Sequence, residues 1–450
     1  MRKKKMDLEI VNPSAAGIDV GSRSHFVAKG QQTDDVREFG VCASDHEELI
    51  SWLKKYGVKT IAMESTGSYW QNLFSALQGA GFEVLLANGK FTKNIKGKKT
   101  DVQDCQWIQK LHSLGLLSGS FLPDETTEHL RTLCRHRSNL MDMAASTSKK
   151  MQKYLRLMNL RLDIVVKDIC GLTGLQIIEA ICQGESDSKV LASFRHGNCR
   201  KTESEISKAL QSNGRKDYLF ALQQEYQIYN ELQAKIIQCE HKIKEQLEST
   251  LKDQRQTEKL KTTDKIHKRI NKNAPKSIDL NQVAFKYFGG VDLMDIEGIS
   301  HSTILTMMSE VGPGGLLKFP TGKHFASWLR LAPNNKISGG KILSSRIPKG
   351  SNRIKTALRL AANCIGNMKG ANLHNFFIRI CIRKGRTAAI TATARKLAII
   401  IWNMVVKKIP YNPPNQYEFL DQKRKRKILE MRKLILKLDI KPTEIGFVTS

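Results

Sequence analysis

A single carboxylate interrupts an apolar stretch near the start of the chain, Ala-Ala-Gly-Ile-Asp-Val-Gly-Ser at residues 15–22. This pattern predicts a short buried strand that carries Asp19. An unpaired Asp in a buried strand is costly, so its carboxylate must be paired, hydrogen-bonded or bound to a cation. Gly21 then permits a turn or the close approach of a ligand. An ordinary Asp at a strand end fits the same letters, and only the downstream pattern favours a functional role.

The first 123 residues alternate between strand and helix signals. Three short strand patterns come first, followed by a helix, a strand, a helix, a strand and a helix. The expected strands are 15–20, 25–29, 36–41, 60–64 and 82–87, and the expected helices are 44–56, 69–80 and 100–117. Ser44 and Glu47 have the spacing of a capping box at the first helix. This order is that of the α/β ribonuclease H-like (RuvC-like) fold, in which the first strand is central and the fourth lies beside it.

Four carboxylates converge in that fold order. Asp19 lies on the first strand, and Glu64 ends the fourth. Asp101 and Asp104 are spaced i, i+3 and share one face of the first turn of the last helix. Either Asp alone would be an ordinary helix cap. Together the four predict a Mg²⁺ site for phosphoryl transfer, with two ions that clamp the attacking and leaving oxygens.

The charge of the chain points to a polyanionic partner. The net charge is +30, and residues 311–417 contain 19 Lys and Arg but no Asp or Glu. Because an ordinary surface mixes both signs, this distribution favours nucleic acid over a merely basic surface or a ribosome-associated role. Residues 90–99 add five lysines without an acid, of which Lys96, Lys98 and Lys99 are expected to hold a phosphate backbone beside the carboxylates.

Cysteine usage and hydropathy predict a cytoplasmic, soluble protein. Nine cysteines are scattered without a C-x-x-C pair, which argues against a zinc ribbon or a disulfide framework. The basic N-terminus has no apolar run behind it, unlike a signal peptide. The longest apolar run, 397–406, is too short to span a bilayer, so no membrane partner is expected.

Residues 124–275 are expected to form a helical arm and a linker, with the linker near 268–276. Apolar residues recur there at spacings of three and four, as in a coiled coil that dimerises or folds back as a hairpin. One helix of an ordinary bundle fits the pattern equally well. The residues of this stripe are Leu219, Leu222, Tyr226, Tyr229, Leu232, Ile236, Cys239, Ile243 and Leu247.

A third, mainly α region at 276–412 contains two glycine-bearing segments. The first, around Gly298, precedes a helix and predicts a helix-hairpin-helix element whose amides bind phosphate, although a plain αα-hairpin looks much the same. The second, Ile-Ser-Gly-Gly-Lys at 337–341, places Ser338 in a carboxylate-free region, where a hydroxyl is the group available for chemistry. A turn serine is the simpler reading. Basic residues lead from this loop into a helix, namely Lys341, Arg346, Lys349, Arg353, Lys355 and Arg359. Residues 413–450 are expected to form a basic C-terminal helix and tail.

Together, Gly-Ile-Asp19-Val-Gly, Met-Glu64-Ser-Thr-Gly, Lys-Thr-Asp101-x-x-Asp104 and Ile-Ser338-Gly-Gly-Lys resemble the DEDD transposase family of bacterial insertion sequences. That family includes Piv-type DNA invertases and bridge-RNA-guided recombinases. The resemblance covers nearly the whole chain: a RuvC-like domain at 1–123, the arm, and a second, serine-bearing transposase domain at 276–412.

The resemblance implies a recombinase that cuts and rejoins double-stranded DNA. Asp19, Glu64, Asp101 and Asp104 would bind Mg²⁺, and Ser338 would attack a DNA phosphate and form a covalent intermediate. Members act as dimers or tetramers in which one subunit's RuvC-like domain completes a site with another subunit's serine domain, and studied members use an element-encoded guide RNA. The chain departs from the family at Cys105, usually Ala, and at Ser300, usually the second hairpin glycine, which weakens the case for phosphate binding there.

Three other functions compete with this reading. A sugar kinase or actin-like ATPase would share the first strand motif but needs an Asp-x-Gly loop that residues 311–417 cannot supply. A RuvC-like metal-dependent nuclease or resolvase would cut without serine chemistry, and a scaffold would bind nucleic acid without cutting it. The nearby Ser344, Ser345 and Ser351 are alternative nucleophiles, although none precedes two glycines.

Overall fold

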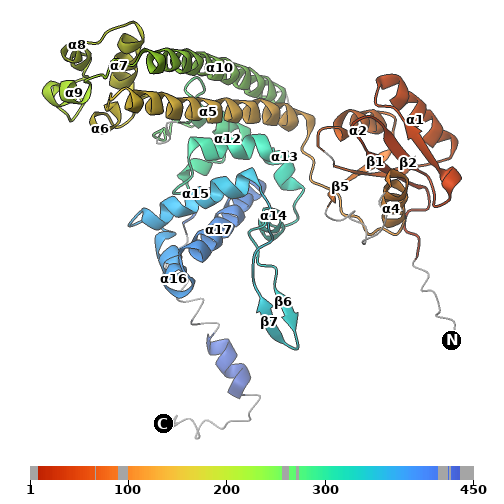
Figure 1. Ribbon diagram of the computed structural model, residues 1–450. Coiled ribbons are helices and arrows are strands. Elements are labelled where there is room, and N and C mark those ends of the chain that lie inside the picture. Colours follow the sequence, from red (N-terminus) through yellow and green to blue (C-terminus); the bar gives the residue numbers. More distant parts are fainter. Residues whose placement is uncertain are drawn as a thin grey trace, which may run out of the picture. The chain divides into compact units, whose positions relative to one another are not determined.

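The computed structural model describes residues 9–65, 67–89, 100–255, 263–269, 273–413, 424 and 427–435. The chain divides into two compact units, Met1–Leu122 and Pro123–Ser450 (Figure 1).

The first unit is built on a mixed five-stranded sheet with the strand order β3-β2-β1-β4-β5. The central β1 pairs antiparallel with β2 and parallel with β4, and these pair in turn with β3 and β5. The order is compatible with the predicted ribonuclease H-like fold. The strands are β1 (Ala15–Val20), β2 (His25–Ala28), β3 (Val36–Phe39), β4 (Thr60–Glu64) and β5 (Glu83–Ala87), with a short 3-10 turn, η1 (Thr33–Asp35), before β3.

Helices cover both faces of this sheet. The helices α1 (Ala43–Lys55) and α2 (Trp70–Gly79) pack on the face that carries Ile18, and α4 (Asp101–Ser113) packs on the other. The predicted capping box at α1 is wrong: the helix begins at Ala43, because the carboxylate that accepts the backbone N–H of Cys42, at 2.9 Å, belongs to Asp45. The helix α4 is also shorter than predicted, because Gly115 adopts a positive φ of 66° just beyond its end.

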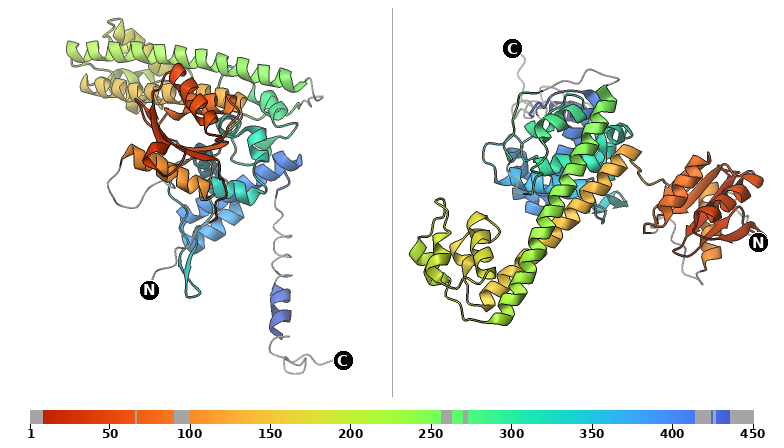
Figure 2. Two further views of the ribbon diagram at one scale, coloured as in Figure 1. Left: turned by 90° about the vertical axis from the view of Figure 1, so that its right-hand side faces the viewer. Right: turned by 90° about the horizontal axis from the view of Figure 1, so that it is seen from above.

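Two long helices dominate the second unit. The helices α5 (Glu125–Leu157) and α10 (Lys216–Arg255) lie side by side, as Figures 1 and 2 show. The Asp124 carboxylate caps α5 by accepting the N–H of Thr127 at 2.8 Å. Most of the predicted apolar stripe on α10 is buried, and within this chain it folds back against α5; a coiled coil stays a prediction. The buried members are Leu222, Tyr229, Leu232, Ile236, Cys239, Ile243 and Leu247.

A buried ion pair ties the two long helices to the segment that follows them. Arg137 of α5 and Glu240 of α10 are only 8% and 3% exposed, and their closest nitrogen and oxygen are 2.7 Å apart. The second oxygen of Glu240 accepts the backbone N–H groups of Lys276 and Ser277, and Arg137 also donates to the carbonyl of Asn273. Burial alone would raise the pKa of Glu240, but these hydrogen bonds outweigh it and hold the pKa below its ordinary value.

Short helices complete the second unit. Between α5 and α10 lie α6 (Leu162–Val165), α7 (Leu172–Cys182), α8 (Ser188–Ser193) and α9 (Glu203–Ala209), gathered at one end of the pair (Figure 2). After α10 come α11 (Leu280–Tyr287), η2 (Leu293–Asp295), α12 (His301–Glu310), α13 (Gly312–Leu317), α14 (Gly322–Trp328), β6 (Lys336–Ser338), β7 (Lys341–Ser344), α15 (Arg353–Asn367), α16 (His374–Lys384) and α17 (Arg386–Lys407).

The helix α17 is the centre of this last group and packs against α14, α15 and α16. Its 22 residues are long and apolar enough to cross a membrane, but half of its most apolar window is buried inside the structure. That burial is typical of the core helix of a helical domain. Beyond residue 413 the described residues, Arg424 and 427–435, are helical, and the rest of the predicted tail lies outside the described residues.

Gly298 packs against α15 instead of standing open to a ligand. Its φ is 78°, and a Cβ there would lie 2.7 Å from the carbonyl oxygen of Ala361. The neighbouring Glu297 accepts a hydrogen bond of 2.7 Å from the Tyr411 hydroxyl and another of 3.3 Å from the backbone N–H of Asn372. These contacts give Gly298 a packing role. The helix-hairpin-helix element and its phosphate binding stay predictions.

Candidate active site and nucleic-acid interface

The pairing of β1 with β4 places Asp19 and Glu64 at one edge and on one face of the sheet. The register aligns Gly17 with Ala62 and Ile18 with Met63, so Asp19 and Glu64 follow at the next position of two parallel strands. Side chains alternate between the faces of a strand. Asp19 therefore shares the face of Gly17, which α4 covers, and both carboxylates lie at the carboxyl ends of their strands.

Gly17 lets α4 lie directly on β1. A Cβ at residue 17 would overlap the backbone nitrogen of Gln109 and the carbonyl oxygen of Cys105. The Gln109 side chain donates to the carbonyl of Ala15 at 3.1 Å, so α4 runs opposite to β1. The N-terminal turn of α4 consequently lies at the same edge of the sheet as Asp19.

That first turn carries the other two predicted carboxylates. Thr100 caps α4 by accepting the N–H of Gln103 at 3.3 Å, which begins the helix at Asp101. Cys105 lies beside these carboxylates: burial, and then the charges of Asp19 and Asp104, raise the pKa of its thiol to about 12. The thiol therefore stays protonated and donates to the carbonyl of Val102 at 3.1 Å. Of the four, Asp101 is the most exposed.

The donor set fits a hard divalent cation. All four predicted ligands supply carboxylate oxygens, which Mg²⁺ prefers, and the protonated Cys105 does not compete as a thiolate. Glu64 also lies against the backbone of Gly89, where a Cβ would overlap its carboxylate. Glycine at this position therefore leaves the room that the Glu64 side chain occupies.

Ser338 lies in a two-residue β-hairpin. The strands β6 and β7 pair Ser338 with Lys341, and the two residues between them, Gly339 and Gly340, have φ values of 53° and 72°. Two positive φ angles are those of a type I′ turn, which glycine adopts without strain. The hairpin extends away from α14 in Figure 1, and Ser338 and Lys341 are exposed. The two glycines are thus explained by the turn, which also leaves the Ser338 hydroxyl accessible.

The predicted nucleic-acid contacts fall into three groups. Lys96, Lys98 and Lys99 lie outside the described residues. Arg346 and Lys349 are exposed in the loop after β7, which leads into α15; Asn352 caps that helix, and it begins at Arg353. Arg353 is not a free surface cation: its Nε lies 3.8 Å from the carboxylate of Glu310.

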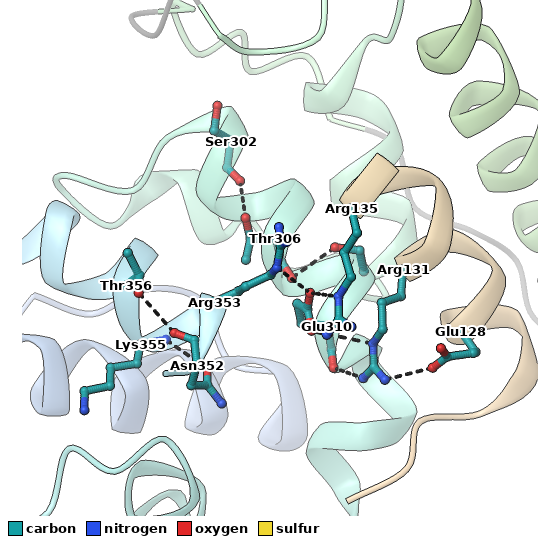
Figure 3. A network of polar contacts seen from close by, with 11 residues as sticks. Glu128, Arg131, Arg135, Ser302, Thr306, Glu310, Asn352, Arg353, Lys355 and Thr356 are labelled. Carbon is teal, nitrogen blue, oxygen red and sulfur yellow. Dashed lines mark hydrogen bonds and ion pairs between the residues drawn. The ribbon is translucent and has the colours of Figure 1, made fainter. Parts of the chain in front are cut away.

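Glu310 is the centre of a polar network that sequence reasoning missed (Figure 3). Its carboxylate is 10% exposed and accepts two hydrogen bonds from Arg135, at 2.9 and 2.7 Å. Arg131, which also pairs with Glu128, donates to the Glu310 carbonyl at 2.8 Å. The network joins α5, the end of α12 and the start of α15. Its only sequence signal is that Glu310 is the last acid before the acid-free stretch.

A second set of candidate metal ligands lies in the other unit. Among the described residues, His267, Asp292 and Asp295 form the group whose ligand atoms all lie within 4.8 Å of one another. His267 Nε2 is 2.7 Å from the Asp292 carboxylate, and Lys265 pairs with Asp295. These side chains satisfy one another as an ion-pair cluster.

Two family models match stretches of the chain that contain the candidate site residues. Residues 16–160 match a family model of DEDD transposases of IS110 type, described as "Transposase". Residues 292–377 match a second model, "Transposase IS116/IS110/IS902 family", so that together the two span just over half of the chain. The chain belongs to the DEDD insertion-sequence transposase family. The first match contains Asp19, Glu64, Asp101 and Asp104, and the second contains Ser338.

A relative in Streptomyces coelicolor is similar over a shorter stretch. It is described as "Insertion element IS110 uncharacterized 43.6 kDa protein" and is 31% identical over 114 residues. The match spans 25% of this chain and 28% of that relative. Residues 161–291, which include all of α10 and His267, lie outside both transposase family matches, whereas Asp292 and Asp295 lie within the second.

Proposed function

We propose that this transposase-family chain is a DNA recombinase that cuts and rejoins double-stranded DNA. The observation that carries the proposal is the pairing of two features in one chain: carboxylates at one sheet edge and an exposed serine in a carboxylate-free, basic region. Asp19, Glu64, Asp101 and Asp104 would hold Mg²⁺, two ions per site, and Mg²⁺ when bound supplies Lewis-acid stabilisation of phosphate oxygens. A homo-oligomer, a dimer or tetramer, and an element-encoded guide RNA belong to the proposal through the family resemblance.

Ser338 is the proposed nucleophile. Its Oγ would form a bond to the phosphorus of a DNA phosphodiester as the bond from phosphorus to one sugar oxygen breaks. The serine proton is lost, and the departing sugar oxygen is protonated. A free DNA hydroxyl would later attack the phosphoserine and restore both the diester and the serine. Lys341, which pairs with Ser338 across the hairpin, and Arg346 in the loop that follows would stabilise the negative charge that develops on the phosphate in the transition state.

The experiment is covalent trapping on a nicked suicide duplex that carries the ends of the element, together with the RNA transcribed from its flank. The parent chain should give a protein–DNA conjugate whose modified peptide contains Ser338. The Ser338→Ala variant should give none, whereas Ser345→Ala, a matched exposed serine of the adjacent loop, should still react. Glu64→Gln and Asp101→Asn should abolish the reaction with the fold intact. Metal-dependent cutting that survives Ser338→Ala would instead assign a RuvC-like nuclease.

A further inference from the structure

Three cations meet where the loop that follows the serine hairpin reaches α15. Arg330, just beyond α14, donates from Nη1 to the carbonyl of Lys349 at 2.6 Å. Lys355, in the first turn of α15, places its Nζ 3.5 Å from the carbonyl of Gly350. Arg359 lies one helical turn further on and donates to the Thr391 hydroxyl at 2.6 Å. All three side chains are partly buried.

The end of α14 directs Arg330 toward this loop. Arg330 has a φ of 55° at the position just after the helix end, where the N–H of Leu331 donates to the carbonyl of Ala326 at 3.0 Å, as in a Schellman motif. Gly350 has a φ of 130°, and a Cβ there would overlap the Arg330 guanidinium. Both conformations bring the guanidinium against the loop backbone, so the position of this cation is set by the fold.

The cluster has no internal counter-charge. In the part of the chain that the structure describes, no carboxylate forms an ion pair with Arg330, Lys355 or Arg359. The nearest acid in sequence, Glu310, is engaged with other arginines, and Figure 3 shows the Lys355 side chain directed away from it. Burial, and then the charges of Arg359 and Arg330, lower the pKa of Lys355. Like charges held together without an acid are relieved by a bound anion.

The same loop connects the cluster to the serine hairpin. The backbone N–H of Asn334, before β6, donates to the carbonyl of Arg346, after β7, at 3.0 Å. The Arg330 bond to Lys349 fixes the loop three residues further on. Two hydrogen bonds therefore fix the loop that joins the hairpin to the cluster. A phosphate bound at the cluster would consequently lie at a fixed position relative to Ser338.

We propose that Arg330, Lys355 and Arg359 bind one backbone phosphate of the DNA that Ser338 attacks. The donors come from the residue just beyond α14 and from the first two turns of α15, and the planar guanidinium of Arg330 offers a fork to two phosphate oxygens. The three are positioning residues, and this role rests on the proposed recombinase function. Lys355 and Arg359 belong to the basic run noted in the sequence, and Arg330 lies outside it.

The test uses the full chain with Ser338→Ala, so that no reaction at that hydroxyl contributes. Inorganic phosphate, compared with chloride at equal ionic strength, should raise the Tm of this chain but not that of the chain that also carries Lys355→Gln. Lys384→Gln, which removes an exposed cation from the end of α16, is the control and should keep the phosphate-induced shift. In chloride alone Lys355→Gln should not lower the Tm, because it removes one of three like charges.

A second readout connects the site to DNA. With duplex DNA, the slope of log affinity against log salt should become shallower by about one for Lys355→Gln, because one phosphate contact no longer releases a counterion. The proposal is overturned if the Lys355→Gln chain keeps either the phosphate-induced rise in Tm or the parental salt slope. These measurements need no strand cleavage. If no Ser338 conjugate is found, the nucleophilic role of Ser338 is refuted, and the phosphate site is still tested by the Tm and the salt slope.

Discussion

At the scale of single residues, Gly17 determines how the carboxylates assemble. The four acids could be picked out as candidate ligands from the sequence, because each lies at a recognisable strand end or helix start. Gly17 gives no such signal, since a glycine in a strand is equally compatible with a bulge or a bend. Its importance depends on which helix covers it, and that is a tertiary fact: the backbones of Cys105 and Gln109 pass where its Cβ would be.

We expect Gly17→Ala to destabilise the first unit and to disturb the carboxylate site. The added methyl group meets backbone atoms, which cannot rotate away, so α4 must shift at a cost of about 1–3 kcal/mol. Gly79→Ala is the matched control, because nothing lies within 4 Å of a Cβ there. Urea unfolding followed by circular dichroism measures both variants. A Gly17→Ala chain as stable as the Gly79→Ala chain would mean that α4 does not lie this close to β1.

At the scale of elements, the strands and helices were predictable where periodicity and turn residues agree. The five strands and three helices of the first unit occur in the predicted order. The hairpin at Ser338 was expected only as a glycine-rich loop, because two strands of three and four exposed residues have no apolar alternation. The basic residues after this loop were expected to lead into a helix, but their spacing does not say where that helix begins; Asn352, whose side chain accepts the N–H of Lys355, sets the start of α15 at Arg353.

Glu240 gives the sharpest prediction at this scale. Glu240→Gln leaves the buried Arg137 without its counter-charge, so the free energy of unfolding should fall by about 3–5 kcal/mol. Glu245→Gln, on the same helix, breaks a 2.6 Å ion pair whose side chains are 68% and 62% exposed, and should cost less than about 1 kcal/mol. Equal losses in the two variants would contradict the buried role.

The Arg137–Glu240 ion pair also predicts how the stability difference between the parent and Glu240→Gln changes with pH. Because the fold lowers the pKa of Glu240, its stabilisation is full above the ordinary value of 4.5 and is lost as the pH falls through the folded pKa. The gap in stability between the parent and Glu240→Gln should therefore narrow below about pH 4.5.

At the scale of the whole molecule, charge and composition could predict a nucleic-acid partner but not which cations are available to it. The 19 Lys and Arg of residues 311–417 form one class in the sequence. In the structure Arg353 pairs with Glu310, whereas Arg330, Lys355 and Arg359 gather without an acid. This sorting depends on side chains from distant elements, such as Glu310 on α12, and spacing along the chain does not encode it.

The last prediction concerns the two units as folding units. Residues 1–122 have their own hydrophobic core, centred on Ile18, Leu49, Ile61 and Leu73, and residues 123–450 have separate cores. Units with separate cores unfold as separate cooperative transitions. Calorimetry of the full chain should resolve two unfolding transitions. Gly17→Ala should lower the Tm of the first unit only, and Glu240→Gln should lower the Tm of the second unit only. A single transition that both variants lower equally would show that the chain unfolds as one unit, and would refute the division at residue 122.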